Sequence, residues 1–466
     1  MIKLCEAVRD VGGRAMLVGG SVRDQLLNID SKDFDIEVYG LHPDRLRRVL
    51  EQIGPVNAVG GNFAVYKLVF YRPEPDRSVS STIEPHLEKD RPGQRFEVDV
   101  SLPRRESKTG RGHRGFVIEG DPSMSFEEAA RRRDFTINAI LLDPLTGETV
   151  DPFGGERDLS QRILRVVSPE TFVEDSLRVL RAVQLAARFE MTIDPPTIAL
   201  CRTIDLLDLP HERIWGELEK LLTLASRPSI GLDAALELQV LEKLFPEFLA
   251  LTSDTAQKEA DSSKDLFLRT KRALDEAVHL TASLSQPKRI AVMLGVICHD
   301  LEWAGGSPAA EPDVNTKVDP RLTRRVLDRL GLYTIGGYDV RAQVFSLVRE
   351  NTIAEEFNRR RASTTDGEIR RLSQRVEIDL LYRVEKAWAL GGRASTGAAD
   401  WLIERAVVLE VQNGPPAPLL LGRHLVEAGI EPGPEIGKLL RAVYEKQLNG
   451  EITTTEEALV AAREIR

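Results

Sequence analysis

The sequence predicts an α+β fold, in which a head with a small mixed β-sheet and helices precedes a long all-α region. Two observations predict it. Residues 14–70 alternate between strand-like and helix-like patterns, whereas nearly every periodic segment after about residue 158 repeats with helical spacing. Between them lies the turn-rich sequence DPFGG at residues 151–155, which is typical of a domain junction.

Four strands and two helices are predicted in the head. A strand is expected at each of residues 14–18, 34–38, 63–69 and 95–101. One helix begins near Val22 with Ser21 as its cap, and another carries the apolar positions Leu46, Val49, Leu50 and Ile53. Residues 71–94 are rich in proline, serine and charge without a clear period, so we expect a flexible loop there.

Breaks in the helical pattern divide the rest of the chain, near residues 226–232, 253–264, 304–320 and 411–418. A chain of 466 residues exceeds the usual size of one hydrophobic core. We therefore predict four domains, namely a head over 1–155, a helical neck over 156–225, a helical body over 226–410 and a helical tail over 411–466.

Composition indicates a soluble cytoplasmic protein. Hydrophobic residues make up 42% and charged residues 29% of the chain. The longest apolar run, Ile290–Cys298, is too short to span a bilayer, and the N-terminus lacks a signal-peptide pattern. The scattered cysteines Cys5, Cys201 and Cys298 indicate buried thiols. The net charge of −10 does not favour a nucleic-acid partner, and the basic clusters at 104–114 and 131–133 do not by themselves indicate one.

Residues 17–38, LVGGSVRDQLLNIDSKDFDIEV, carry a pattern that indicates a metal site. Asp33 and Asp35 are two apart on a predicted strand and point to one face. Their mutual repulsion is relieved by a cation, and hard oxygen ligands suit Mg²⁺. Asp99 completes a three-carboxylate site for two ions if its strand is a neighbour. The ordinary alternative is a solvated strand face. Glu37, two residues further along, points to the same face as the two aspartates and shows how common this spacing is.

The glycines that precede this strand favour a phosphate site. Gly19 and Gly20 follow one predicted strand and open a helix, so backbone N–H groups can approach a triphosphate. Arg23 lies in the first turn of that helix, within reach of the same phosphates. A strand–GGxxRD–helix unit followed by a DxD strand is far more specific than either motif alone.

GGSVRD and DFDIEV resemble the nucleotidyltransferase core of the class II tRNA CCA-adding enzyme and bacterial poly(A) polymerase family. The resemblance continues, in the family's order, through RRRDFTINAI (131–140), DPFGGERDL (151–159), EDSLRVLRAVQLAARF (174–189) and HERIWGELEKLL (211–222). It implies that CTP and ATP are joined to a tRNA 3′ end with release of pyrophosphate, and that Mg²⁺ is the cofactor. Residues 151–155 then resemble the family's hinge between head and neck.

The resemblance also implies how nucleotides are selected. Asp175 and Arg178, three apart on a predicted helix, would read the amine and ring acceptor of C or A, and Arg181 would support the nucleotide. An ordinary surface ion pair is the alternative for such spacing. Gln184 stands where the family often carries a third arginine. Arg133 and Asp134 resemble its ribose- and phosphate-contacting residues.

His299-Asp300 follows the apolar run and resembles the HD metal-dependent phosphohydrolase domain found in some members. The histidine expected near Arg269 is missing, so we predict a degenerate HD-like body that grips tRNA, with His299-Asp300 as a structural pair. Residues 422–452 are expected to form a small helical unit.

Several alternatives stay open. Poly(A) polymerase shares the head motifs, although VGGNFAVYKL (59–68) lacks the basic run expected of that branch. A CC-only or A-only enzyme is a second alternative, and an HD phosphohydrolase is a remote third. An RNA-binding protein with an inactive head is disfavoured by the intact motif residues.

Overall fold

A computed structural model of the chain describes residues 1–31, 33–59, 65–73, 93–108, 116–252, 266–304 and 319–465. The chain divides into two compact units, and each is described by itself. The first comprises Met1–Leu209 with Glu237–Val240, and the second comprises Pro210–Leu236 with Leu241–Arg466. The finer division into head, neck, body and tail stays a prediction.

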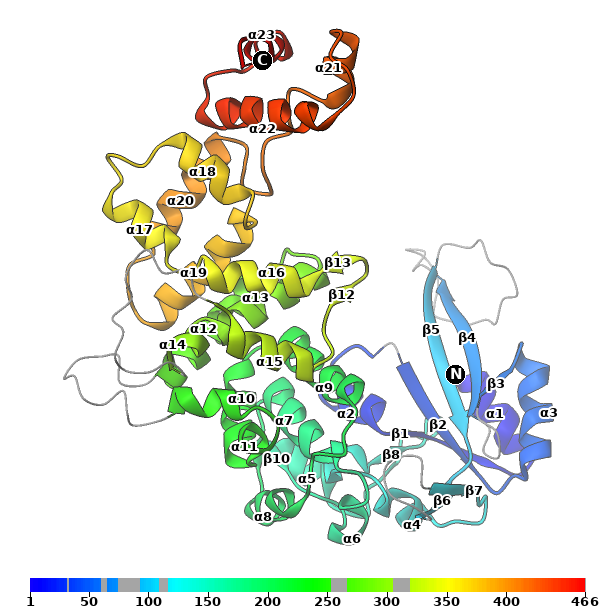
Figure 1. Cartoon of the computed structure of the whole chain (residues 1–466). Coiled ribbons are helices and arrows are strands. Elements are labelled where there is room, and N and C mark those ends of the chain that lie inside the picture. Colours follow the sequence, from blue (N-terminus) through cyan, green and yellow to red (C-terminus); the bar gives the residue numbers. More distant parts are fainter. Residues whose placement is uncertain are drawn as a thin grey trace, which may run out of the picture. The chain divides into compact units, whose positions relative to one another are not determined.

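The first unit is built on a seven-stranded mixed sheet (Figure 1), which confirms the predicted α+β head. Only the pair β2–β5 is parallel among the described strands of this sheet; its other neighbours are antiparallel. The strands, in spatial order, are β3 (Asn57–Val59), β4 (Val65–Pro73), β5 (Gly93–Ser101), β2 (Asp33–Tyr39), β1 (Arg14–Val18), β8 (Leu141–Leu142) and β9 (Thr149–Val150).

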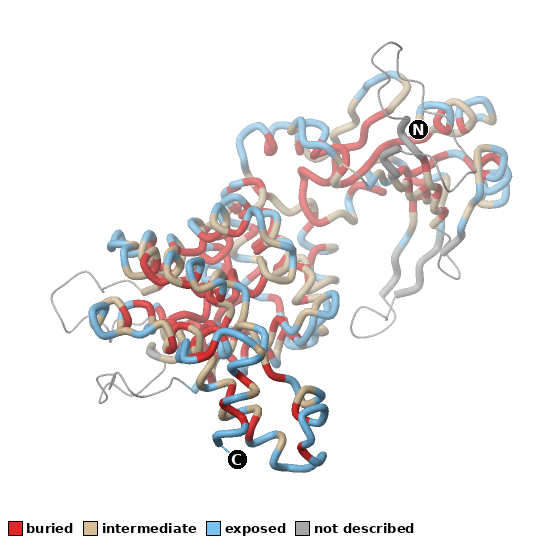
Figure 2. Tube along the Cα trace, turned by 90° about the horizontal axis from the view of Figure 1, so that it is seen from above, coloured by how far each residue is buried: buried red, intermediate tan, exposed pale blue. Residues whose placement is uncertain are grey.

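The two faces of the sheet are covered differently. On one face, Ile36 and Val98 pack in a core with α1 (Ile2–Asp10) and α3 (Pro43–Ile53), and the buried strands are visible in Figure 2. On the other face, Met16, Val18 and Tyr39 pack with α4 (Phe126–Arg131). That cover reaches only part of β2, so the strand is buried from Ile36 to Tyr39 but exposed at Asp33 and Asp35.

Two predictions about the head need correction. Strand pairing of β4 with β5 continues to Pro73↔Gly93, because residues 71–73 and 93–94, predicted as loop, extend the two strands; residues 74–92 of that loop lie outside the described residues. Helix α2 (Gly20–Leu26) begins two residues early, and the Ser21 hydroxyl donates to the Val18 carbonyl at 2.9 Å instead of capping it. Strands β6 (Arg104–Lys108) and β7 (Phe116–Gly120) were not predicted, and neither were the short strands β3, β8 and β9.

Helices α5 (Gly155–Ser160), α6 (Pro169–Phe172), α7 (Leu177–Phe189) and α8 (Pro195–Thr203) complete the first unit, with the short 3₁₀ helix η1 (Thr136–Asn138) and the strand pair β10 (Ile163–Leu164) and β11 (Thr192–Ile193). The segment predicted as a junction is closely packed. The Asp151 carboxylate accepts hydrogen bonds from the N–H groups of Gly155 at 2.7 Å and Glu156 at 2.9 Å, and so satisfies the start of α5.

We expect Gly155→Ala to destabilise the first unit by about 3 kcal/mol, at the upper end of overpacking effects. A Cβ at this position would collide with the Thr136 carbonyl oxygen, which is backbone and cannot rotate away. Gly216→Ala is the control, because a Cβ there has no heavy atom within 4 Å. Thermal or urea unfolding measures both. Equal stability of the two variants would contradict the prediction.

The second unit is almost entirely helical, as predicted. Its long central helix α13 (Gln286–Cys298) contains the predicted apolar run, and every residue from Ile290 to Cys298 is buried. The other elements after Leu209 are α9 (His211–Leu224), α10 (Pro228–Glu237), α11 (Val240–Leu244), η2 (Pro246–Thr252), α12 (Leu266–Leu280), α14 (Leu301–Ala304), α15 (Arg321–Arg329), β12 (Thr334–Ile335), β13 (Tyr338–Asp339), α16 (Val340–Arg349), α17 (Ile353–Arg359), α18 (Asp366–Ser373), α19 (Ile378–Gly391) and α20 (Gly397–Val408).

The breaks between helices agree only in part with the sequence. The break predicted at 226–232 is shorter, because α9 ends at Leu224 and α10 begins at Pro228. Residues 253–264 and most of 304–320 lie outside the described ranges. The break predicted at 411–418 falls between α20 and α21 (Gly422–Glu427). After it, α21, α22 (Pro434–Asn449) and α23 (Thr455–Ile465) share an apolar cluster of their own, and the separate helical unit expected there stays a prediction.

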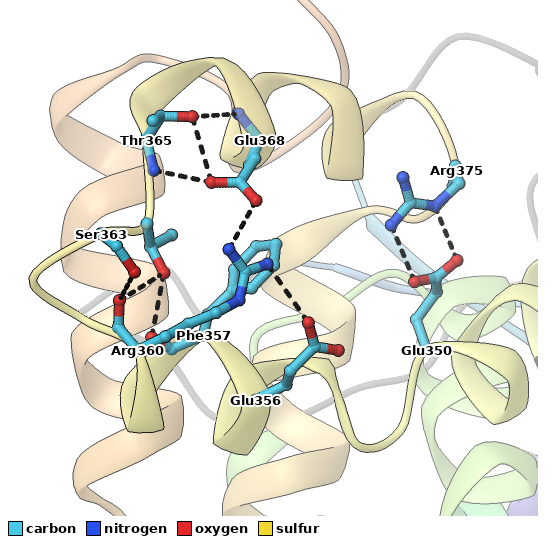
Figure 3. Close-up of polar contacts among 9 residues, drawn as sticks. Glu350, Glu356, Phe357, Arg360, Ser363, Thr365, Glu368 and Arg375 are labelled. Carbon is cyan, nitrogen blue, oxygen red and sulfur yellow. Dashed lines mark hydrogen bonds and ion pairs between the residues drawn. The ribbon is translucent and has the colours of Figure 1, made fainter. Parts of the chain in front are cut away.

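Side-chain contacts fix the turn between α17 and α18 (Figure 3). Thr365 and Glu368 form a reciprocal capping box at the start of α18. Arg360 donates to Glu368 at 2.6 Å and to Glu356 at 3.2 Å, with its guanidinium over the Phe357 ring. The capping box satisfies N–H groups at the start of α18, and the contact from Arg360 to Glu368 ties the end of α17 to that helix. Within the described part of the chain, no helix has the length and apolar character needed to cross a membrane.

Candidate active site

The predicted metal-binding carboxylates lie on two neighbouring strands. β2 and β5 pair in parallel, with Asp35 directly opposite Asp99 and Asp33 opposite Glu97. Because directly paired residues project to the same face of a sheet, Asp33, Asp35 and Asp99 share one face. The adjacency of strands on which the three-carboxylate interpretation depends is therefore present.

The two oxygens of Asp99 have different surroundings. Oδ2 accepts a hydrogen bond from Lys67 Nζ at 3.1 Å, and Lys67 is the residue opposite Asp99 on β4. Oδ1 is buried and has no hydrogen-bond partner within the described residues. A buried oxygen without a partner is costly, and a cation would satisfy it.

The pKa of the Asp35 carboxyl is raised above its ordinary value. Although Asp35 is exposed by area, protein atoms around its carboxyl disfavour the charge, and this desolvation is the largest cause. Arg133 lowers the pKa, whereas the charges of Asp99, Asp33 and Glu37 raise it further. A bound cation would offset the repulsion among these carboxylates.

The chemistry of the donor set fits a divalent metal, but the side chains are not gathered around one point. Among the residues that the structure describes, no group of three or more histidine, cysteine, aspartate or glutamate side chains is arranged to hold a metal ion. The shared strand face, the unsatisfied Asp99 Oδ1 and the raised pKa of Asp35 suit the hard oxygen site that Mg²⁺ prefers. Asp33, Asp35 and Asp99 stay the predicted ligands.

The Gly19 turn lies beside Asp35. Gly19 has a φ of +75°, a conformation that favours glycine, and Val18 before it pairs with Asp35 across β1 and β2. A Cβ on Gly19 would lie 3.1 Å from Arg133 Nη1 and 3.7 Å from Asp35 Oδ2. A Cβ on Gly20 would lie 3.2 Å from Arg23 Nη2. The structure thus brings Gly19, Asp35 and Arg133 together.

Arg23 lies beside the Gly20 turn, where side chains of the protein hold its guanidinium. Its side chain is buried, with Nε and Nη2 donating to Asp24 Oδ1 at 2.9 and 2.6 Å and Nη1 donating to Asn138 Oδ1 at 2.7 Å. The guanidinium carbon lies 4.2 Å from the centre of the Phe189 ring. The position in the first helical turn was right, but partners distant in sequence draw the side chain inward.

Asp134 and Arg181, both predicted to contact the nucleotide, contact each other. Arg181 Nε donates to Asp134 Oδ2 at 2.6 Å, and the Asn138 amide and the Phe135 N–H donate to Oδ1 at 3.0 and 2.8 Å. Burial alone would raise the pKa of Asp134, but Arg181 and these donors hold it below its ordinary value. Through Asn138 this pair joins Arg23, so Arg23 and Arg181 belong to one largely buried network of polar contacts.

The predicted base-reading pair sits at the start of α7. The helix begins at Leu177, so Asp175 precedes it, and Asp175 Oδ1 accepts a hydrogen bond from the Leu177 N–H at 3.1 Å. Arg178 donates to the Thr171 carbonyl at 2.8 Å and to the Arg132 carbonyl at 2.7 Å. Each of these terminal nitrogens carries a second N–H, which these two contacts do not use. Gln184, one turn beyond Arg181, is buried.

Sequence reasoning missed three residues of this site. Glu37 is buried and binds both Arg132 and Arg133. In the sequence it points to the same strand face as Asp33 and Asp35, so the pattern alone does not distinguish it from them. Asn138 and Asp24 hold Arg23. Asp24 lies in the motif GGSVRD and Asn138 in RRRDFTINAI, so both could have been named as candidate site residues. A sequence motif does not show, however, that the two side chains contact Arg23.

His299 and Asp300 form a close pair at the end of α13. Nδ1 of His299 lies 2.6 Å from Asp300 Oδ1, and the imidazole stacks on Trp388 with ring centres 4.3 Å apart. Arg269, where the resemblance led us to expect a histidine, lies over the same Trp388 ring at 4.7 Å. Nε2 of His299 is buried and has no hydrogen-bond partner among the described residues, so the contacts satisfy only one side of the imidazole. The loss of hydrolase activity stays a prediction.

Two protein families match parts of the chain. Residues 15–165 match the family described as the poly A polymerase head domain. Residues 190–251 match the family described as the probable RNA and SrmB-binding site of polymerase A. The first match contains the sheet face with Asp33, Asp35 and Asp99, together with Arg133 and Asp134.

Curated relatives include proteins named multifunctional CCA protein. Those of Mannheimia succiniciproducens and Stenotrophomonas maltophilia are each 37% identical to this chain over 292 residues, which is 61% of this chain and 62% and 63% of theirs. That of Actinobacillus pleuropneumoniae is 33% identical over 305 residues, which is 64% of this chain and 65% of its own. The chain therefore covers less than two thirds of the length of these relatives.

Solved structures show the same fold. The CCA-adding enzyme of Thermotoga maritima complexed with tRNA matches 99% of this chain and 93% of its own, and that of Bacillus stearothermophilus in complex with CTP matches 100% and 96%. Each is 20% identical to this chain with a TM-score of 0.60. Residues 15–165 of the chain therefore form a poly A polymerase head domain, and the chain has the fold of the solved CCA-adding enzymes.

Proposed function

We propose that this chain is a CCA tRNA nucleotidyltransferase, which adds C, C and A to tRNA 3′ ends from CTP and ATP, with Mg²⁺ as its metal. The observation that supports it most is the placement of Asp35 opposite Asp99 in the parallel strand pair, next to the Gly19 turn and Arg133. The names of the curated relatives and of the structurally similar enzymes point to the same activity.

The proposed reaction is phosphoryl transfer. The 3′-hydroxyl oxygen of the RNA forms a bond to the α-phosphorus of the incoming nucleotide as the bond to the bridging oxygen breaks, and pyrophosphate leaves. Mg²⁺ held by Asp33, Asp35 and Asp99 would stabilise the negative charge that develops on the phosphate oxygens. Gly19 and Gly20 let the backbone approach the triphosphate, and Arg133 lies where its guanidinium can bind it.

Asp134, Arg23 and Arg181 act indirectly in this proposal. Their charges are paired within the buried network, so they hold α2 and α7 in place beside the site. Asp175 and Arg178 remain the proposed base-reading residues. A carboxylate that accepts from the exocyclic amine of C or A would face a carbonyl in G or U and leave buried groups unpaired.

We expect Asp175→Ala to relax nucleotide choice by about ten- to a hundredfold, measured as the ratio of kcat/KM for CTP to that for UTP. Its effect on tRNA binding should be smaller. Because Asp175 also accepts from the Leu177 N–H, alanine removes a helix-terminal contact as well. Asp175→Asn keeps an oxygen acceptor there, while its amide can donate to the carbonyl of U or G. Relaxed choice in both variants supports base reading, and unchanged discrimination in Asp175→Asn would contradict it.

The function is tested with a tRNA transcript that ends at the discriminator base. Each nucleoside triphosphate is offered singly and all are offered together, and the 3′ ends are sequenced. Addition that stops at CCA supports the proposal. Long adenosine tracts on any RNA would support poly(A) polymerase, and addition that stops at CC or requires a CC end would show a partial enzyme.

The body and compartment are part of the same proposal. We propose a degenerate HD-like body, because Arg269 and Trp388 pack around His299-Asp300. Phosphatase activity lost in His299→Ala but kept in Asp33→Ala would overturn it. We also propose the cytoplasm as the compartment, because the buried Cys5 and Cys298 form no disulfide among the described residues, as expected in reducing surroundings.

A further inference from the structure

Glu37 is a buried carboxylate with cationic partners on the strand that carries the predicted metal ligands. It lies two residues after Asp35 on the same face of β2, and only 2% of its surface is exposed. A buried carboxylate is costly unless it is paired. Oε1 accepts from Arg132 Nη2 at 2.5 Å and from Arg133 Nη2 at 3.2 Å, and Oε2 accepts from the Tyr39 hydroxyl at 2.9 Å.

Arg133 is held between this buried carboxylate and the open end of the site. While Nη2 donates to Glu37, Nη1 lies 3.1 Å from the position of a Gly19 Cβ, and Asp35 Oδ2 lies 3.7 Å from the same point. Arg133 Nε is buried and has no hydrogen-bond partner in the ranges that the structure describes. The guanidinium therefore has one end fixed by Glu37 and the other beside the glycine turn.

We propose that Glu37 is a positioning residue, which holds the Arg133 guanidinium over the Gly19 turn so that a bound triphosphate meets it already in place. The role rests on the proposed nucleotidyltransferase function. An arginine side chain has several rotatable bonds, and ordering it on binding costs affinity. When the guanidinium is already fixed in the folded protein, this conformational entropy is not lost again on binding. Its orientation matters because charge-assisted contacts to phosphate depend on it.

The positioning role makes a prediction that a purely structural ion pair does not. Glu37→Gln keeps the size of the side chain and one acceptor oxygen but removes the charge that holds Arg133. We expect the Kd for inorganic tripolyphosphate, measured by titration calorimetry without metal, to rise about tenfold. KM for CTP and for ATP should rise by the same factor, because the contact is to phosphate, while kcat changes less than threefold and the choice between nucleotides is kept.

Tyr39→Phe is the matched control. It removes the third hydrogen bond to Glu37 without touching either arginine, so tripolyphosphate affinity should stay within twofold of wild type. In an Arg133→Ala background, Glu37→Gln should have no further effect on tripolyphosphate affinity, because the residue through which it acts is gone. If Glu37→Gln does not fold, Glu37→Asp is the alternative variant, because it keeps the charge but retracts it by one methylene. The same rise in the Kd for tripolyphosphate is expected for it.

The outcomes separate this inference from the proposed function. A folded Glu37→Gln variant with wild-type tripolyphosphate affinity overturns the positioning role, and so does an undiminished loss in the Arg133→Ala background. Failure of the wild-type protein to bind tripolyphosphate also overturns it. Binding with the expected dependence on Glu37, in a protein that leaves tRNA transcripts unextended, supports the positioning role and overturns the proposed function instead.

Discussion

Replacement of Asp35 by alanine is expected to abolish nucleotide incorporation, with kcat/KM lowered at least about a thousandfold. Asp35 lies opposite Asp99 and next to the Gly19 turn, so its loss removes the carboxylate that links the proposed metal site to the triphosphate. Primer extension on a tRNA transcript measures the effect. Asp44→Ala is the control, because Asp44 lies on α3 with 81% of its side chain exposed. Full activity of Asp35→Ala would refute the metal-site assignment.

The same carboxylate should lower the stability of the metal-free protein at neutral pH. Because the folded-state pKa of Asp35 is raised, its contribution to stability is fully present below the unfolded pKa of about 3.9 and is lost as pH rises through the folded pKa. Asp35→Asn should therefore melt at a higher temperature than wild type in EDTA at pH 7. The gain should vanish below about pH 4. Added Mg²⁺ should stabilise wild type but not the variant. A variant that melts lower than wild type at pH 7 would contradict this account.

The strands of the head could be predicted because their patterns are local. The strand at Arg14–Val18 has the predicted ends, and the alternation at residues 95–101 correctly assigned Val98 to the core and Asp99 to the other face. Strand order could not be predicted in this way. That β2 and β5 are parallel neighbours depends on how the intervening residues fold, so the meeting of Asp35 with Asp99 stayed conditional until the structure was known.

The sequence could not show which side chains of the site are buried. Asp33, Asp35 and Glu37 have the same parity and nearly the same chemistry, but α4 packs over the end of β2 and buries Glu37 alone. Arg23 was expected at the phosphates because of its place in a helical turn. Its partners Asn138 and Phe189 lie far along the chain, and no local pattern shows that they converge on its guanidinium.

Asp134→Ala should strongly destabilise the first unit. The removal of one partner from a buried ion pair costs about 3–5 kcal/mol, because the other charge is left uncompensated. Arg181 is about a third exposed, so water can solvate part of its charge, and we expect about 3 kcal/mol. Asn138 also loses an acceptor. Hydrogen exchange followed by mass spectrometry should show about a hundredfold lower protection of the α7 amides, which pack beside this pair.

Two further variants decide whether the unpaired charge is the cause. Asp134→Ala combined with Arg181→Met leaves no charge behind, so the double variant should recover part of the lost stability. Because the folded-state pKa of Asp134 is lowered, its carboxylate stabilises the fold at pH values above about 3.9, and this contribution is lost as pH falls through the lower folded pKa. The difference between wild type and Asp134→Asn should thus be constant near neutral pH and shrink below about pH 4. A double variant no more stable than Asp134→Ala would show that the network holds α7 by packing and not by charge.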